Sequence, residues 1–234
     1  MKVIIPAAGL GTRFADQHLG IPKELLPLGN MPILGHALAE AARGGFDSAT
    51  VVLSPAKQQV RQFLNERGLP LPVDVVIQPE ALGIGDAVLR CWQDEPIGVL
   101  LPDDVVLDSE HWEILFEVHN NDGAAALCVR TVPSETTSRF GIAECEGNRV
   151  IGLVEKPPPG TARSNLAIFG RYIVNSDVAA GLKSVRPNGE LQLTYGFAAA
   201  INSPRGVRSV RFEGEIYDCG TPAEYAASVA RFPA

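Results

Sequence analysis

The segment Ile4–Phe14, with the sequence IIPAAGLGTRF, determines how the rest of the chain is interpreted. It begins as an apolar run typical of a buried strand and ends in small residues that include Gly9 and Gly11. Small residues let a backbone approach a phosphate closely enough to offer its N–H groups. Arg13 and, ten residues later, Lys23 add the positive charge that phosphates require. The segment therefore predicts a cradle for a nucleoside triphosphate.

Two other glycine-rich loops are excluded by residues that the segment lacks. A dinucleotide-binding loop needs a third glycine, but Phe14 occupies that position. That fold also needs an acidic residue at the end of the second strand, where Leu53 and Ser54 stand. A Walker A loop needs Gly-Lys-Ser/Thr, which does not occur in the segment. A long loop with Arg13 and Lys23 matches neither motif.

Short apolar runs alternate with amphipathic segments over the first 130 residues, which is typical of a parallel sheet with helices on both faces. Beyond residue 130 the pattern changes to a hairpin, further strands and short helices. We expect strands at 3–5, 50–53, 73–77, 97–101, 124–129, 141–146, 150–155, 166–174, 207–212 and 215–218. We expect helices at 32–42, 55–67, 85–93, 109–121 and 190–202, and others capped by Ser176 and Thr221.

These elements predict an α/β fold of the Rossmann-like type, with a mostly parallel mixed sheet and helices on both faces. The chain is long enough for one large domain. We therefore expect a single domain over residues 1–234. Residues 1–130 would form its nucleotide-binding half, and residues 131–234, with a small β-rich subregion, would bind the second substrate.

Polar residues follow several of the predicted strands. Gln78 comes directly after the third strand, Asp103 follows the fourth, and Asp218 ends a late one. Ligands of open α/β sheets bind beyond the carboxyl ends of the strands. Two acids beside a phosphate loop suit Mg²⁺, which favours about one or two carboxylates completed by phosphate oxygens and water. Each aspartate alone could instead cap a helix or form a turn, and Glu155 with Lys156 could be a solvated ion pair at a strand end.

The composition restricts the partners of the chain. It has 234 residues, a net charge of −7 and a pI of about 5.1. Nucleic acids and anionic membranes favour basic surfaces, so we expect neither as a partner. No apolar run approaches the roughly 20 residues of a membrane span, and no signal peptide is recognisable, which predicts a cytoplasmic protein. The four cysteines lack metal-ligand spacing, which favours reduced thiols.

A longer series of motifs resembles one enzyme family. The segments Pro6–Arg13, with the sequence PAAGLGTR, and Pro22–Leu28, with the sequence PKELLPL, resemble sugar-1-phosphate nucleotidylyltransferases. The nearest subgroup is the bacterial UTP–glucose-1-phosphate uridylyltransferases. Further matching segments follow in the same order over nearly the whole chain: LPDD (101–104), VEKP (154–157), SNLAIFGRY (164–172), GELQLT (189–194) and DCG (218–220).

The resemblance implies a reaction and a set of site residues. Such enzymes join a nucleoside triphosphate (NTP) to a sugar 1-phosphate and release pyrophosphate, so we expect these substrates, with UTP and glucose 1-phosphate first. The resemblance also implies Mg²⁺ as cofactor and a homo-oligomer. It assigns catalysis to Arg13 and Lys23; nucleotide binding to Ala8, Gly9, Gly11, Thr12, Gln78 and Gly83; sugar-phosphate binding to Gly141, Glu155, Lys156 and Asn165; and metal binding to Asp103 and Asp218.

Two positions depart from the family pattern. Asp86 stands where the uridylyltransferases usually have His, and Tyr195 stands where they usually have Asp. The same chemistry with TTP or another triphosphate, and with a specialised sugar or cyclitol phosphate, therefore stays open. A third hypothesis is a non-catalytic regulatory protein that binds nucleotide sugars. Arg13, Lys23, Asp103 and Asp218 argue against it, because a protein that has lost turnover should lose charged residues that cost stability.

Overall fold

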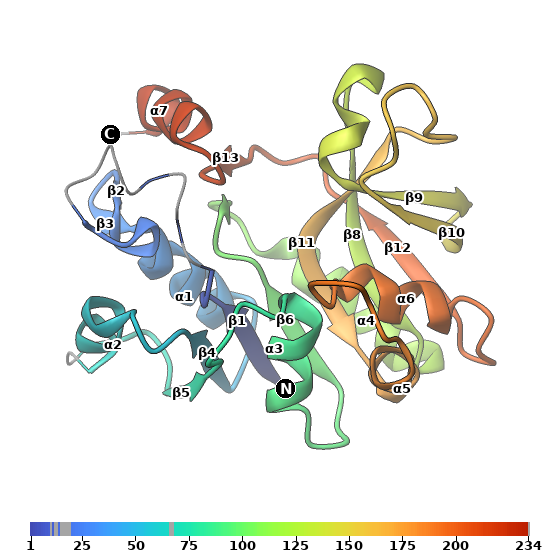
Figure 1. The fold of residues 1–234 in the computed structure, drawn as a ribbon, viewed down its shortest axis with the longest axis horizontal. Helices are drawn as coiled ribbons and strands as arrows, with labels where there is room; N and C mark the ends of the chain where they lie inside the picture. The colour runs from blue at the N-terminus through green and yellow to red at the C-terminus, as the bar shows by residue number, and fades with distance from the viewer. Residues whose placement is uncertain (10, 12–13, 15–19, 66–67, 234) are drawn as a thin grey trace. The chain divides into compact units, whose positions relative to one another are not determined.

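The structure of the chain is a computed structural model, and it describes residues 1–9, 11, 14, 20–65 and 68–233 (Figure 1). The chain forms two compact units. Unit 1 comprises residues 1–81, 100–109 and 214–234, and unit 2 comprises residues 82–99 and 110–213. Each unit is assembled from separate stretches of the chain. A single domain with halves that meet at residue 130 stays a prediction.

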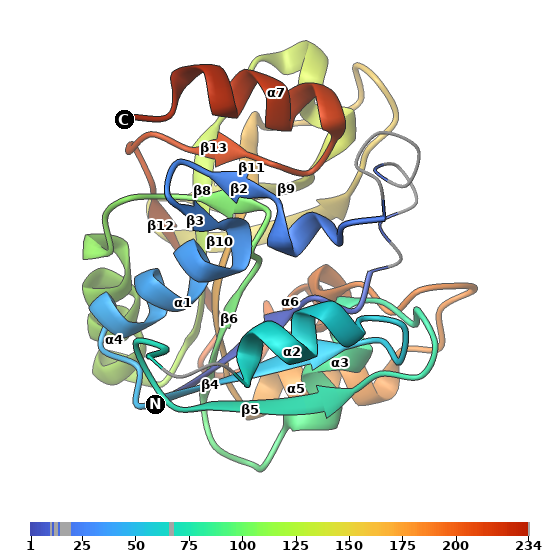
Figure 2. The same cartoon turned by 90° about the vertical axis from the view of Figure 1, so that its left-hand side faces the viewer.

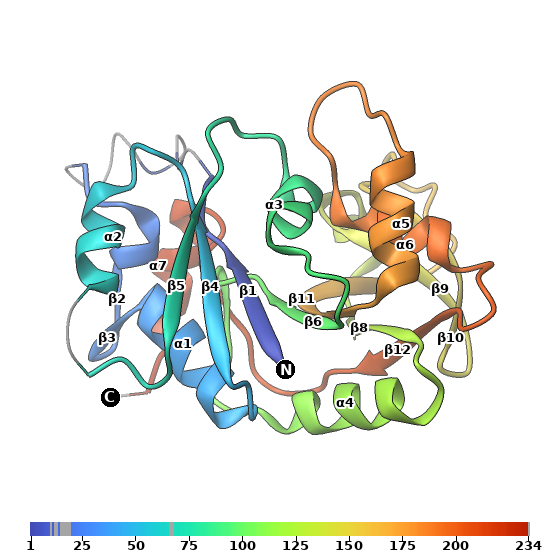
Figure 3. The same cartoon turned by 90° about the horizontal axis from the view of Figure 1, so that it is seen from below.

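A three-stranded parallel sheet forms the centre of unit 1. Its strands are β1 (Lys2–Pro6), β4 (Ser48–Leu53) and β5 (Val73–Ile77), in the order β5-β4-β1 (Figure 3). The apolar run in β1 is fully buried from Val3 to Ile5. The next residues, Ala7 and Gln78, each donate their backbone N–H to the end of β4, to Val52 O and Leu53 O. The glycine loop and Gln78 therefore begin at the carboxyl edge of this sheet.

The remaining elements of unit 1 are short. They are η2 (Lys23–Leu25), the hairpin of β2 (Pro27–Leu28) and β3 (Met31–Pro32), and the helices α1 (Ile33–Arg43), α2 (Gln58–Leu64) and α7 (Pro222–Arg231). β7 (Asp104–Val105) pairs antiparallel with β13 (Tyr217–Asp218). Figure 2 shows α7 beside β13 and the β2–β3 hairpin beside α1. The pairing of β7 with β13 joins residues more than a hundred positions apart.

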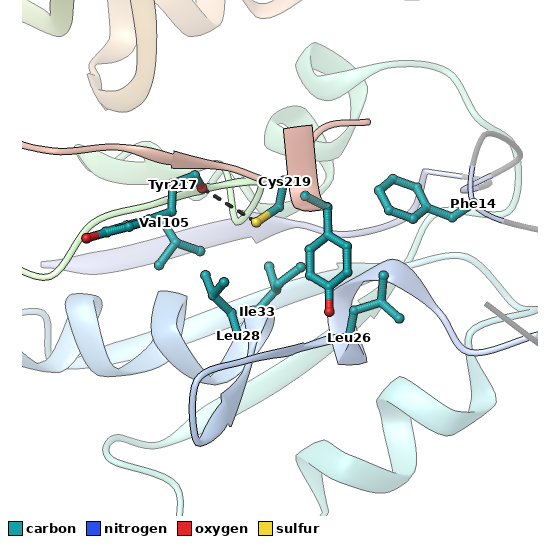
Figure 4. Close-up of a cluster of buried hydrophobic side chains, with 8 residues drawn as sticks. Phe14, Leu26, Leu28, Ile33, Val105, Tyr217 and Cys219 are labelled. Carbon is teal, nitrogen blue, oxygen red and sulfur yellow. Dashed lines mark hydrogen bonds between the residues drawn. The ribbon is translucent and has the colours of Figure 1, made fainter. Parts of the chain in front are cut away.

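A buried apolar cluster holds these short elements together (Figure 4). It combines side chains from the glycine loop, the β2–β3 region, β7, β13 and α7. The Tyr225 hydroxyl donates to Pro27 O at 2.6 Å, and the Phe14 ring meets the Tyr225 ring edge-on at 6.3 Å. The members of the cluster are Phe14, Leu26, Leu28, Ile33, Val105, Tyr217, Cys219 and Tyr225. Burial of these side chains fixes η2 and β7 against the end of the chain.

Unit 2 has a mixed sheet in the order β6-β11-β8-β12-β10-β9. β8 is parallel to β12 and antiparallel to β11, and β9 and β10 form an antiparallel hairpin. Its strands are β6 (Ile97–Leu100), β8 (Ala125–Thr131), β9 (Gly141–Glu146), β10 (Arg149–Glu155), β11 (Leu166–Val174) and β12 (Val207–Arg211). Its helices are α3 (Ile84–Cys91), α4 (Glu110–Asp122), η3 (Ser134–Arg139), α5 (Ser176–Ser184) and α6 (Leu193–Ala200).

The expected strands at 73–77, 141–146 and 166–174 are confirmed with their bounds, and so is the Thr221 cap, whose side chain accepts from Glu224 N. Three helix predictions are wrong. The helix expected at 55–67 begins at Gln58. Ser176 is not the cap of α5, because the Asn175 side chain accepts from the first backbone N–H groups. The helix expected at 190–202 spans only Leu193–Ala200, because the backbone N–H and C=O of Leu191 are bonded to Leu82 and Gly85 instead of to a helical turn.

Among the described helices, none is long and apolar enough to cross a membrane.

His36 in α1 makes the stability of the fold depend on pH. Its Nε2 lies 2.7 Å from Leu28 O, and the ring packs edge-on against Phe232. Burial lowers the pKa of His36, with a smaller lowering by Arg43, while the bond to Leu28 opposes both. The unfolded state therefore binds more protons than the folded state once the pH falls through about 6.5.

We expect the free energy of unfolding to fall between pH 8 and pH 5.5, and to fall less in His36→Gln, whose amide can still donate to the Leu28 carbonyl. Urea unfolding midpoints at the two pH values measure this. Equal pH dependence in the wild type and the variant would contradict it.

Candidate active site

The glycine loop leaves β1 at the carboxyl edge of the unit 1 sheet. Ala8 is buried, whereas a Cβ added to Gly9 would meet no atom of the described residues within 4 Å. Gly11 has a φ of +64°, a left-handed conformation that favours glycine. No described residue therefore crowds Gly9, and Gly11 sets the turn. Two of the predicted residues in this loop, Thr12 and Arg13, lie outside the described residues.

Lys23 and Asp103 meet directly. Lys23 Nζ donates to Asp103 Oδ2 at 2.5 Å, and both side chains are partly buried. Lys23 lies in η2, and Asp103 lies between β6 and β7. Because a charge-assisted bond of this kind fixes both side chains, the lysine is held beside a carboxylate at the site where phosphates are predicted.

Backbone pairing brings Asp103 and Asp218 together. Cys219 N donates to Asp103 O at 2.7 Å, and Asp218 is the register partner of Asp104 in the β7–β13 ladder. The Asp218 carboxylate also accepts from Gly220 N at 2.8 Å, which orients it. Two of the acids predicted from strand ends therefore lie on adjacent segments of unit 1.

The Cys219 thiol reports the negative charge of this cluster. Burial and, to a smaller extent, the charges of Asp103, Asp218 and Asp104 together raise the pKa of Cys219 to about 12, against a lowering by Lys23. The thiol is therefore protonated at neutral pH and inert as a nucleophile. It donates to Tyr217 O at 3.5 Å and packs in the apolar cluster (Figure 4).

The carboxylates of Asp103 and Asp218 suit one kind of divalent cation, a hard ion such as Mg²⁺. Within the described part of the chain, no group of three or more His, Cys, Asp or Glu side chains could enclose a metal. A structural zinc cage is therefore absent from these residues. Asp103 and Asp218 supply the one or two carboxylates that Mg²⁺ takes from a protein when substrate phosphates and water complete its shell. The donor set therefore suits Mg²⁺ held jointly with a nucleotide.

Within unit 2, the backbone of Leu191 lies so close to position 83 that only glycine fits there. Gly83 has a φ of +93°, and an added Cβ would lie 2.6 Å from Leu191 O. The loop around Gly83 is bonded to Leu191 at both ends, through Leu191 N to Leu82 O and Gly85 N to Leu191 O, each at 2.8 Å. The close backbone approach requires glycine whether or not a nucleotide binds there.

Gly141 and Glu155 are register partners in the β9–β10 hairpin, and a third residue, Thr194, contacts both of them. Thr194 Oγ1 donates to Glu155 Oε2 at 2.8 Å. A Cβ added to Gly141 would lie 3.0 Å from Thr194 Cγ2 and 3.1 Å from Glu155 Oε2. The sequence contained this residue within the GELQLT segment, but the spacing alone gave no reason to place its hydroxyl on Glu155.

Lys156 has an uncommon backbone conformation. Its φ is +44°, and Lys156 N donates to Phe140 O at 3.1 Å. Non-glycine residues in this region are strained and occur often at functional sites. The side chain is 60% exposed, and its Nζ lies 3.8 Å from Glu155 Oε1. The strain favours a functional role over a solvated ion pair, for which no special backbone is needed.

Asn165 lies in a different environment. It is exposed and lines a cavity of about 330 Å³ with Ser134, Thr137 and Arg163. None of these neighbours belongs to the predicted sugar-phosphate residues.

The two departures from the family pattern have separate surroundings. Asp86 accepts from Arg90 Nε at 2.6 Å, one turn further along α3, so it forms a helical ion pair. Tyr195 is half-buried in the first turn of α6.

Comparison with known proteins identifies the family. Residues 2–231 match the family described as nucleotidyl transferase. The UTP–glucose-1-phosphate uridylyltransferase of Bacillus subtilis is 33% identical over an alignment that covers 99% of this chain and 90% of that protein.

Solved structures agree with this match. A UDP-glucose pyrophosphorylase complexed with UDP-glucose superposes with a TM-score of 0.89 and 26% identity, covering 98% of this chain and 97% of that one. A UTP-bound UGPase from Acinetobacter baumannii gives 0.86 and 27%, covering 99% and 92%. The chain belongs to the nucleotidyl transferase family, and the Rossmann-like α/β fold and the enzyme class predicted from the sequence are confirmed.

Gly83→Ala tests the close approach to Leu191. The added Cβ would overlap Leu191 O, so we expect a loss of about 2–4 kcal/mol in the free energy of unfolding. Gly45→Ala is the matched control, since Gly45 has a φ of +83° with no atom within 4 Å of an added Cβ. Chemical unfolding of both variants separates the overlap from the backbone cost. Equal losses in the two variants would show that the Leu191 contact is unimportant.

Proposed function

We propose that the protein transfers a uridylyl group from UTP to glucose 1-phosphate and yields UDP-glucose and pyrophosphate. The contact between Lys23 and Asp103, next to Asp218, carries this proposal. It places one ammonium group and two carboxylates in the unit that also holds the glycine loop. The names of the relatives support UTP and glucose 1-phosphate as the substrate pair.

The reaction is an in-line displacement at phosphorus. An oxygen of the glucose 1-phosphate group attacks the α-phosphorus of UTP, and the bond from that phosphorus to the oxygen bridging to the β-phosphorus breaks. The bridging oxygen leaves with pyrophosphate. The protein positions the two phosphates and neutralises the charge that develops. Lys23 would neutralise the reacting phosphates, and Arg13 would stabilise the leaving pyrophosphate.

Asp103 and Asp218 would hold Mg²⁺ together with substrate phosphate oxygens, and the cation would supply further charge neutralisation there. Asp103 is also bonded to Lys23, so its carboxylate orients the lysine.

The remaining predicted residues divide into two sets. Ala8, Gly9, Gly11 and Thr12 would offer the loop backbone to the nucleotide, with Gln78 and Gly83 meeting the base and ribose. A Gln side chain both donates and accepts, which suits the edge of a pyrimidine.

Glu155 would accept from sugar hydroxyls beside Gly141, and Lys156 would bind the sugar phosphate. Thr194 would hold Glu155 in place. Asn165 has the weakest support, since it lines another cavity.

The alternative is the same chemistry with TTP or another triphosphate and with another sugar or cyclitol phosphate. It is motivated by Asp86 and Tyr195, the two positions that depart from the family pattern. A cytoplasmic location and a homo-oligomer belong to the proposal and rest on the family resemblance.

Pyrophosphate release over a matrix of triphosphates and sugar phosphates with Mg²⁺ tests the substrates. We expect the highest kcat/KM for UTP with glucose 1-phosphate. Faster release with TTP or with another sugar phosphate would replace this pair and keep the reaction. Nucleotide binding without release in any combination would contradict the reaction and support a regulatory protein.

Substitutions in the charged cluster of Lys23, Asp103 and Asp218 test the proposed roles of these residues. We expect Lys23→Ala and Asp103→Asn each to lower kcat by about 10²–10³, the scale for losing one group that stabilises transition-state charge. Lys183→Ala, on the exposed surface of α5, is the control and should keep wild-type kcat. Full activity in either cluster variant, in protein shown to be folded by circular dichroism, would remove that residue from the site.

A further inference from the structure

Unit 1 contains a buried ion pair that the proposed reaction does not use. Lys57 Nζ donates to Glu24 Oε2 at 2.6 Å, and the two side chains are only 8% and 1% exposed. Buried lysine and glutamate are rare because each must leave water, and a buried pair often contributes no more stability than apolar side chains of the same size. A pair retained at such a position calls for a role beyond stability.

The pair joins three segments of the predicted phosphate site. Glu24 directly follows Lys23 in η2. Lys57 lies between β4 and α2, where its backbone N donates to Ser54 O at 3.1 Å. A Cβ added to Gly11 would lie 3.9 Å from Lys57 Nζ, so the ammonium group borders the backbone of the glycine loop.

The hydrogen bonding around the pair is incomplete. Glu24 Oε1 and Ser54 Oγ are buried without a hydrogen-bond partner within the part of the chain that the structure describes. Folded proteins satisfy almost all such atoms, and exceptions concentrate at functional sites. An ion pair selected for stability alone would have both carboxylate oxygens bonded.

We infer that Lys57 is a positioning residue for nucleotidyl transfer, acting through Glu24 and through the backbone of Gly11. This inference rests on the proposed function. The pair fixes η2 relative to the glycine loop and so fixes the distance from the Lys23 ammonium group to the phosphates held by that loop. Lys57 itself need not touch the substrate.

Neutral replacement of both partners separates positioning from stability. Glu24→Gln/Lys57→Met removes both charges, so no uncompensated buried charge remains. We expect a folded protein whose kcat is about 10- to 100-fold lower, the scale of a small misplacement of reacting groups. The reference is the exposed pair of the same unit, replaced as Glu215→Gln/Arg231→Met, which should keep wild-type kcat. A folded neutral variant with kcat within about twofold of the wild type would overturn the inference.

Lys57→Arg keeps the charge and decides the matter if the double variant does not fold. The wider guanidinium group can still pair with Glu24, but it cannot keep the ammonium group's place beside Gly11. We expect an unfolding midpoint near that of the wild type and a kcat about tenfold lower. Unchanged kcat in Lys57→Arg would show that the pair only supports the fold.

The wild type separates the two claims. If it releases pyrophosphate from no substrate pair, the proposed function fails. If it is active and the Lys57 variants are equally active, only the positioning role fails.

Discussion

The hydrogen bond from Cys219 N to Asp103 O, next to the short β7–β13 ladder, is the contact on which the proposed site depends. It aligns two chain segments that lie more than a hundred residues apart and brings Asp103 beside Asp218. Neighbouring carboxylates repel each other, and a nearby cation offsets this repulsion. Lys23 supplies one cation in the structure, and a divalent ion carried in with a nucleotide would supply another. The bond and the adjacent ladder therefore hold the two aspartates where the proposed reaction needs them.

The apolar cluster of unit 1 packs against the buried side of that ladder. Val105, Tyr217 and Cys219 contribute the buried side of β7 and β13, while Leu26 and Leu28 anchor the segment that carries Lys23. The polar and apolar parts of this region are thus made by alternate residues of the same short segments. Cys219 lies where the two parts meet, and burial together with the adjacent carboxylates raises the pKa of its thiol.

Much of the fold could be predicted from the sequence because local patterns determine it. Apolar runs such as Ile97–Leu100, which is buried throughout, form strands, and the change of pattern near residue 130 indicated the mixed sheet. Helix ends were less predictable, because long-range bonds decide them: Leu191 is held by Leu82 and Gly85, so α6 begins later than its apolar pattern suggests. The positions of Asp103 and Asp218 at strand ends predicted that they lie close together, and the structure places them on adjacent segments. The sequence could not predict the bonds of Thr194 to Glu155 or of Lys57 to Glu24, because these partners lie 39 and 33 residues away.

The central claim is that Asp103 and Asp218 together bind a divalent cation in the presence of a nucleotide. Mn²⁺ replaces Mg²⁺ at oxygen ligands and can be followed by electron paramagnetic resonance. We predict that UTP strengthens Mn²⁺ binding to the wild type, that Asp103→Asn and Asp218→Asn each abolish this UTP-dependent binding, and that Asp74→Asn, at an exposed position of β5, leaves it unchanged. UTP-dependent Mn²⁺ binding that survives in both cluster variants would contradict the claim.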